Sequence, residues 1–438
     1  MENTDRYNIA FRKALETLNE AQIRAVNQIE GPVLVIAGPG TGKTQILAAR
    51  IGKILSDTDT DPHNILCLTY TDAGAVAMRR RLFNFIGPDA WRVNIYTFHA
   101  FCNDIIQENL DYFGKLSLDA LSDLEQVELF RKLIDSFPEN HVLKRYRGDV
   151  YFEAARLKDL FSTMKREDWL PGYISQKIDD YLQAIRDSEP GSAYYKIFKY
   201  AGRGNQEAGG LKPAFEQEVE RMEKLRAAAN EFHTYQRMMR EMNRYDFDDM
   251  IGWILEAFKK DPDFLLNYQE KYHYILVDEY QDTSGAQNEL IRLLISYWDV
   301  PNIFVVGDDD QSIYRFQGAN VENIAAYSTR YAQDLFRVML TDNYRSSQPI
   351  LDAARVLIER NLERISLPGL SKQLVSRSTG ALMAAHPVIR EYQTQLHEFA
   401  DITRQVKKLL EDKVPPAEIA VIYKEHRIGE ELSNYFQL

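Results

Sequence analysis

The segment Ala37–Thr44, with the sequence Ala-Gly-Pro-Gly-Thr-Gly-Lys-Thr, constrains the fold more than any other part of the chain. The apolar run Val33–Ile36 precedes it, and Gln45–Ile51 follows with helical spacing of its apolar residues. A buried strand, a glycine-rich loop and a helix in this order form a phosphate cradle, because backbone N–H groups and the helix N-terminus face the anion. A glycine-rich turn that binds nothing is the alternative, and the Gly-Lys-Thr ending disfavours it. The chain is therefore predicted to bind a nucleoside triphosphate.

Each residue of this loop has an expected part in holding ATP and Mg²⁺. Lys43 is expected to reach the β- and γ-phosphates, and the Thr44 hydroxyl is expected to hold Mg²⁺. The phosphate loop usually opens with glycine, and alanine is tolerable there because the close approach to phosphate falls on later glycines. The remaining predicted ATP-binding positions of the loop are Ala37, Gly38, Pro39, Gly40, Thr41 and Gly42.

Short apolar segments that predict strands alternate with helical patterns in two separate parts of the chain. This alternation predicts a parallel α/β sheet. Residues 113–244 carry helical patterns only, so we expect a helical insertion within the α/β domain. Near the end, residues 419–423 predict a further strand and residues 428–436 a helix. The predicted strands of the sheet are Val33–Ile36, Ile65–Thr69, Val93–Thr97, Tyr274–Val277, Ile303–Val306 and Val338–Leu340.

Composition narrows the class of protein without naming a function. A chain of 438 residues is long enough for roughly three domains at about 150 residues each. Its net charge of −12 argues against a purely electrostatic nucleic-acid binder, although a local basic track stays compatible with it. The two cysteines, Cys67 and Cys102, suit a reducing interior. No apolar run approaches the ~18 residues of a membrane span, so the cytoplasm is the expected location and no membrane partner is expected.

Two adjacent acids, Asp278 and Glu279, follow the predicted strand Tyr274–Val277. In a phosphate-loop enzyme, an acid at the end of such a strand holds Mg²⁺ and the next one deprotonates the attacking water. We therefore assign the metal to Asp278 and the general-base role to Glu279. A solvated acidic turn is the alternative, and the phosphate loop in the same chain disfavours it. Asp282 lies in the same turn and is expected to cap the helix that follows.

A third polar cluster follows the predicted strand Ile303–Val306. Gln311 is neutral and bidentate, which suits a γ-phosphate oxygen or the attacking water. Tyr314 and Phe316 offer stacking faces for single-stranded bases, with core packing as the alternative. The three acids Asp308–Asp310 are expected to form a solvated or helix-capping turn rather than a metal site.

Taken in order, these motifs and their neighbours resemble the N-terminal half of a superfamily 1 helicase of the UvrD/Rep type. The resemblance covers residues 15–350 firmly and the remainder weakly. It implies a RecA-like P-loop NTPase fold, with a first motor domain at residues 1–112 and 245–333. Residues 113–244 would form the helical insertion, and residues 334–438 part of a second RecA-like domain. Besides the phosphate loop, the matching segments are residues 18–22, 68–75, 96–101, 245–250, 278–282, 307–316 and 340–347.

The resemblance also assigns roles to individual residues. It implies that Gln22 contacts the adenine edges, that Tyr344 stacks on the adenine face, and that Arg345 reaches the γ-phosphate. The path of single-stranded DNA would be lined by Tyr70, Thr97, His99, Tyr314 and Phe316. The chain departs from the family pattern at several positions, including Gln45, where the family commonly has arginine, and Phe316, where it commonly has tryptophan.

Basic groups outside these motifs are weaker candidates for DNA contact. Arg79–Arg81 follows residues 68–75, which resemble the family's first DNA-contact motif, and this run is as compatible with phosphate contact as with a solvated helix face. Lys144-Arg145 and Lys165-Arg166 are better explained as solvated faces.

The function implied is an ATP-dependent DNA helicase or translocase on single-stranded DNA, with 3′→5′ polarity and duplex/single-strand junctions as further partners. Nothing after Arg345 matches the later family motifs, so we expect the chain to be the N-terminal portion of a longer motor. Two other interpretations stay open. One is an ATP- and DNA-binding fragment without efficient turnover, and the other is the motor part of a RecB/AddA-type helicase–nuclease.

Overall fold

A six-stranded parallel sheet forms the centre of the computed structural model, which describes residues 9, 11–114, 119–201, 207–311, 322–361, 372–379 and 386–436. The strand order is β3-β2-β6-β7-β1-β8, and every neighbouring pair is parallel. Each of the six predicted strands is present, which confirms the α/β class with a parallel, RecA-like sheet. The strands are β1 (Val33–Ala37), β2 (Ile65–Thr69), β3 (Asn94–Thr97), β6 (Tyr274–Val277), β7 (Ile303–Gly307) and β8 (Phe336–Leu340).

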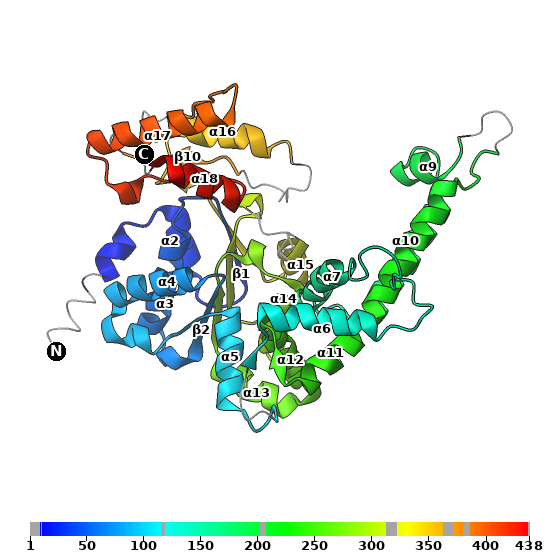
Figure 1. Cartoon of the computed structure of the whole chain (residues 1–438). Coiled ribbons are helices and arrows are strands. Elements are labelled where there is room, and N and C mark those ends of the chain that lie inside the picture. Colours follow the sequence, from blue (N-terminus) through cyan, green and yellow to red (C-terminus); the bar gives the residue numbers. More distant parts are fainter. Residues whose placement is uncertain are drawn as a thin grey trace.

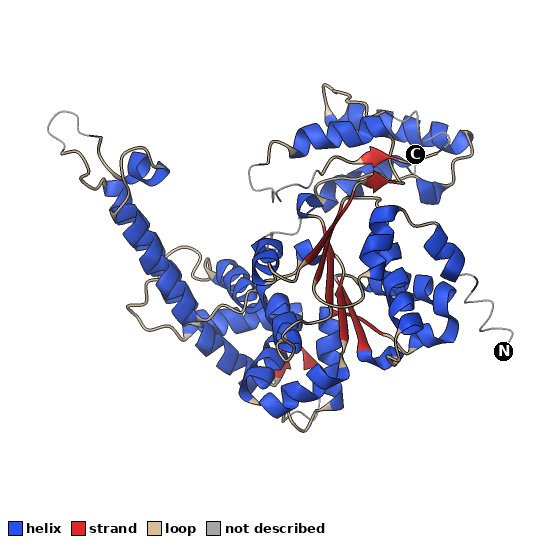
Figure 2. Ribbon diagram, turned by 180° about the vertical axis from the view of Figure 1, so that it is seen from behind, coloured by secondary structure: helices blue, strands red, loops and turns tan. Residues whose placement is uncertain are grey.

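Helices cover both faces of this sheet, as Figure 2 shows from behind. Successive side chains of a strand point to opposite faces, so Val33 and Val35 pack in one core and Leu34 and Ile36 in the other. The first core includes α2 (Glu20–Asn27), α3 (Lys43–Asp57) and α4 (Asp72–Ile86). The second includes α5 (Phe98–Glu108), α12 (Phe247–Lys260), α13 (Pro262–Lys271), α14 (Gly285–Ile295) and α15 (Glu322–Arg330). Burial on both faces explains why the strands are apolar throughout.

The insertion between β3 and β6 is mainly helical, and in Figure 1 its long helix α10 projects away from the sheet with α9 near its far end. Its two-residue strand β4 (Asp119–Ala120) pairs with β5 (Arg244–Tyr245) at the base of the insertion. The helices are α6 (Asp123–Asp135), α7 (Ala154–Arg166), α8 (Pro171–Arg186), α9 (Ala193–Phe198), α10 (Pro213–Asn230) and α11 (Phe232–Glu241).

A buried charge cluster joins the insertion to the sheet domain. Lys165 on α7 is only 8% exposed, and its Nζ lies 2.7 Å from both Asp246 Oδ2 and Asp249 Oδ1 at the start of α12. The Tyr235 hydroxyl of α11 lies 3.3 Å from the same ammonium group. The two carboxylates raise the pKa of Lys165 against the opposing effect of burial. The expectation of a solvated face at Lys165 was therefore wrong, because the apolar residues around α7 enclose the lysine side chain.

The remaining elements follow the sixth strand. β8 pairs with β1 and completes the edge of the first sheet, whereas the resemblance implied that residue 334 onward belongs to the second domain. Two short strands, β9 (Asp342–Asn343) and β10 (Val375–Ser376), pair with each other. The helices are α16 (Gln348–Ile358), α17 (Gln395–Glu411) and α18 (His426–Phe436), and the last confirms the helix expected at 428–436.

The strand predicted at residues 419–423 was wrong. This segment is neither helix nor strand, and within the described part of the chain no strand pairs with it. Ile422 is 94% exposed, so the apolar pattern here does not correspond to a buried strand. Among the described residues, no helix has the length and apolar character that crossing a membrane requires.

Candidate nucleotide-binding site

Two glycines give the phosphate loop its shape. Gly40 and Gly42 have φ angles of 68° and 90°, a region that disfavours residues with a side chain. A Cβ at Gly40 would lie 2.7 Å from Arg345 Cβ, and one at Gly42 would lie 2.9 Å from Gln22 Nε2. Helix α3 begins directly after the loop at Lys43. The loop is therefore a tight turn enclosed by residues far away in the sequence.

A cavity of about 460 Å³ opens beside this loop. It collects side chains from the phosphate loop, the acidic turn after β6, the turn after β7 and the segment after β8. All four residues predicted to act in hydrolysis line it, namely Lys43, Glu279, Gln311 and Arg345. The predicted ATP-binding residues that line it are Gln22, Pro39, Gly40, Gly42, Lys43, Thr44 and Tyr344.

The centre of the cavity holds a close ion pair. Lys43 Nζ lies 2.6 Å from Glu279 Oε2, and Gln281 Nε2 donates to the same oxygen at 2.8 Å. Gln311 Nε2 donates to Asp308 Oδ2 at 2.6 Å. The lysine predicted to bind phosphate and the residue predicted to act as base therefore neutralise each other in this structure.

Asp278 lies behind Glu279, where it is only 7% exposed. Burial, and next the charge of Glu279, raise the pKa of Asp278 to about 7. A carboxylate with this surplus of nearby negative charge is well suited to a divalent cation, which would stabilise its ionised form. Asp278 and Thr44 therefore fit the donor set expected for Mg²⁺, a carboxylate and a hydroxyl.

The segment after β8 is hydrogen-bonded to the phosphate loop. Asn343 Nδ2 donates to Pro39 O, and Tyr344 N donates to Gly40 O at 2.9 Å. Asn343 Oδ1 in turn accepts from Arg345 N at 2.9 Å. Asn343 is fully buried, so it fixes the backbone that presents Tyr344 and Arg345 to the cavity.

Several predicted residues are engaged in structural hydrogen bonds. Gln22 completes the capping box of α2 with Asn19, and its Nε2 donates to Thr41 O at 2.8 Å. Thr97 Oγ1 caps α5 by accepting from Ala100 N. Thr41 Oγ1 donates to Gly38 O at 2.8 Å, and Ala37 is buried as the last residue of β1.

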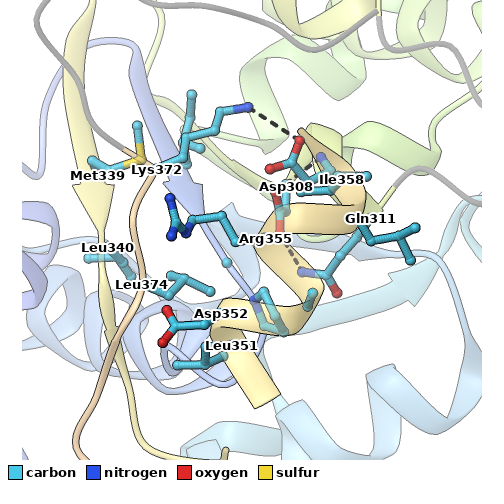
Figure 3. Close-up of a pocket in the computed structure, with 16 residues that line it drawn as sticks. Asp308, Gln311, Met339, Leu340, Leu351, Asp352, Arg355, Ile358, Lys372 and Leu374 are labelled. Atoms are coloured by element: carbon cyan, nitrogen blue, oxygen red, sulfur yellow. Dashed lines mark hydrogen bonds and ion pairs between the residues drawn. The ribbon is translucent and has the colours of Figure 1, made fainter. Parts of the chain in front are cut away.

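A second cavity of about 290 Å³ also borders the loop, and Gly38 and Pro39 line it. Figure 3 shows apolar side chains of β8 and α16, with Leu374, around this cavity, and Asp308 and Gln311 at its polar side. Lys372 forms an ion pair with Asp309. Asp308 and Asp309 are buried, so the turn at residues 308–310 is not solvated at these two positions. Asp308 Oδ1 accepts from Asp310 N at 3.1 Å at the start of the short helix Asp309–Gln311, which agrees with the helix-capping alternative.

The residues predicted to contact DNA are only partly brought together. Tyr70 and His99 line one cavity of about 340 Å³, together with Arg166 from the insertion and Asp282 from the acidic turn. Thr97 is not among its lining residues. Tyr314 and Phe316 lie outside the described residues.

Sequence reasoning missed or misplaced several residues. Thr17, Gln45 and Arg81 also line the nucleotide cavity, and Arg81 belongs to the basic run that was considered for DNA. Arg79 instead donates to the carbonyl oxygens of residues 90, 93 and 95. Asp282 does not cap α14, because Ser284 and Gln287 form its capping box. The run of three arginines in the sequence indicated a possible anion contact. Only the fold shows that Arg81 faces the cavity while Arg79 bonds to backbone carbonyls.

A parallel sheet with a phosphate loop after β1 and paired acids after β6 defines a P-loop nucleotide-binding protein of the RecA-like class. The UvrD/REP helicase N-terminal domain matches residues 18–332, and the UvrD-like helicase C-terminal domain matches residues 338–438. The chain therefore belongs to the UvrD/Rep helicase family.

Curated relatives agree with this assignment. The ATP-dependent DNA helicase PcrA of Staphylococcus epidermidis is 28% identical over 411 residues, which are 94% of this chain and 48% of that protein. PcrA of Staphylococcus aureus is 30% identical over 351 residues, which are 80% of this chain and 41% of that protein. The chain thus spans about half the length of the curated relatives it matches.

Proposed function

We propose that this chain is the ATP-hydrolysing motor part of a DNA helicase that moves along single-stranded DNA. The observation that carries the proposal is the convergence of Lys43, Glu279, Gln311 and Arg345 on one cavity. The first three lie in the part matched by the N-terminal helicase domain, and Arg345 lies in the part matched by the C-terminal one. Closure of a site between two such parts is how a nucleotide couples to movement.

The ion pair between Lys43 and Glu279 supports a change of partners when a nucleotide binds. A bound triphosphate would compete for Lys43 and release Glu279, which then accepts a proton from the attacking water. Arg345 and Gln311 would contact the γ-phosphate. Thr44 and Asp278 would hold Mg²⁺, which supplies charge neutralisation on the phosphates when bound.

Single-stranded DNA would pass through the cavity lined by Tyr70 and His99, with Thr97, Tyr314 and Phe316 as further proposed contacts. Aromatic faces hold single-stranded bases without strong sequence preference. We propose 3′→5′ movement and binding at duplex/single-strand junctions on the basis of the family alone. The proposed division into a first motor domain, a helical insertion and a part of a second motor domain follows the same resemblance, with β8 in the first sheet.

Steady-state ATP hydrolysis with and without oligo-dT tests this function, with Lys43→Ala and Glu279→Gln beside the unchanged chain. We expect stimulation by oligo-dT that both substitutions abolish, because each removes a group at the reacting phosphate. ATP binding without stimulated hydrolysis would favour a binding module instead, and unaffected hydrolysis by Lys43→Ala would reject the proposed site.

A further inference from the structure

Gln281 connects the proposed base to a second carboxylate. Its side chain is 1% exposed, and its amide nitrogen donates to Glu279 Oε2 at 2.8 Å and to Asp282 Oδ2 at 3.2 Å. Its Oε1 accepts from Asp308 N at 2.9 Å, which fixes the amide against the end of β7. Both N–H groups of Gln281 are therefore directed at carboxylates, one facing the nucleotide cavity and one facing away from it.

Asp282 lines a different cavity from Glu279. It is 7% exposed, and among the described residues no hydrogen-bond donor reaches its Oδ1. The cavity of about 340 Å³ that it lines also contains Tyr70, His99 and Arg166. A buried carboxylate oxygen without a donor is costly, so a rotation of the Asp282 side chain that brings this enclosed oxygen to a donor bound in the cavity is favoured. Burial, and next the charge of Glu279, also raise the pKa of Asp282 to about 6.

Glu279 Oε2 is shared between Lys43 and Gln281 in this structure. If a nucleotide takes Lys43, as in the proposed function, Gln281 is the described partner that remains on this oxygen. The same amide nitrogen is also drawn toward Asp282. A donor that bonds Asp282 from the other cavity withdraws negative charge from this carboxylate, which weakens its bond to one N–H group of Gln281 and lets the amide move closer to Glu279 through the other.

We propose that Gln281 positions Glu279 for hydrolysis, and that Asp282 couples this positioning to a nucleobase N–H group bound in the cavity of Tyr70 and His99. This inference rests on the proposed function. The donor must come from a base, because the sugar and phosphate groups of a DNA strand carry no hydrogen-bond donor between its ends. The coupling thus runs from the strand through Asp282 and Gln281 to the base of the reaction.

The first test measures kcat and KM for ATP at saturating oligo-dT in Gln281→Ala. We expect kcat to fall roughly 10- to 100-fold with KM within about twofold, since misplacing a reacting group costs turnover rather than substrate binding. Gln269→Ala is the matched control, because Gln269 is also buried but bonds to Leu293 O and Ser296. An unchanged kcat in Gln281→Ala, or an equal loss in Gln269→Ala, would overturn the positioning role.

The second test compares oligo-dT with an abasic oligomer of equal length as activator, built from tetrahydrofuran units that lack a hydroxyl at C1′. We expect the stimulated-to-unstimulated kcat ratio to fall roughly tenfold in Asp282→Ala, and the abasic oligomer to stimulate neither protein. Equal stimulation of Asp282→Ala and the unchanged chain would overturn the coupling. Lack of any oligo-dT stimulation in the unchanged chain would instead reject the proposed function, and the inference with it.

Discussion

At the scale of single residues, Glu279 has a strained backbone within the site. Its backbone adopts the left-handed conformation, with φ 48° and ψ 47°, which residues other than glycine rarely occupy. Such conformations cost about 1–3 kcal/mol and persist where the surroundings fix them. Here the surroundings are Lys43 and Gln281 on its carboxylate. The strained residue is thus also the one proposed to activate water.

The raised pKa of Asp278 predicts how stability depends on pH without nucleotide. Because the folded-state pKa of about 7 exceeds the usual 3.8, the folded protein holds a proton that the unfolded chain releases. This contribution to stability is complete below about pH 4 and is lost as the pH rises through 7. Asp278→Asn should remove this dependence and be more stable than the unchanged chain at pH 8, by up to roughly 4 kcal/mol.

Denaturant unfolding of both proteins at pH 5 and pH 8 measures this difference. The substitution should also weaken Mg²⁺-dependent nucleotide binding, since an amide is a poorer ligand than a carboxylate. If the unfolding free energy changes equally between pH 5 and pH 8 in both proteins, the raised pKa assigned to Asp278 is contradicted.

Among the elements, α7 and α12 show how the insertion is fixed to the sheet domain. Lys165 on α7 meets the two acids of the capping box of α12, and Ser162 Oγ on the same helix donates to Asp248 Oδ2 at 3.1 Å. His99 Nε2 lies 3.8 Å from Asp248 Oδ1. The start of α12 is therefore the common support of the insertion and of the proposed DNA cavity.

Removal of the buried cation should destabilise the fold strongly. Lys165→Met leaves the half-buried carboxylates of Asp246 and Asp249 without their buried counter-charge, so we expect a loss of about 3–5 kcal/mol. Lys158→Met on the exposed face of the same helix is the control, with an expected change within about 0.5 kcal/mol. Equal unfolding free energies for the two variants would show that the cluster contributes nothing to stability.

Sequence patterns predicted the helices and strands better than the side-chain contacts that join one element to another. The six strands followed from apolar runs, because a strand buried on both faces leaves that mark in sequence. Arg50 left no such mark, although it is buried in α3 and donates to the carbonyls of Ala25, near the end of α2, and of Ile29, just after that helix. Burial lowers the pKa of Arg50 to about 9. A cation that binds carbonyl oxygens looks like any surface arginine in the sequence.

At the scale of the whole molecule, the nucleotide cavity joins segments that lie some 300 residues apart in the chain. The motifs predicted that Lys43, Glu279, Gln311 and Arg345 would act together, and they do line one cavity. The motifs did not predict that Asn343 would bond to the phosphate loop. Side-chain to backbone bonds of this kind depend on three-dimensional distance, which a motif does not encode.

Nucleotide binding by Arg345→Ala tests most directly whether one nucleotide site spans both family domains. If Arg345 contacts the γ-phosphate, the substitution should weaken binding of a fluorescent ATP analogue roughly tenfold or more, and binding of the matching ADP analogue by less than about twofold. Arg355→Ala is the control, because Arg355 lines the other cavity and pairs with Glu359. Selective loss of ATP over ADP in Arg345→Ala alone is the predicted result. Unchanged ATP affinity in that variant would contradict the shared site.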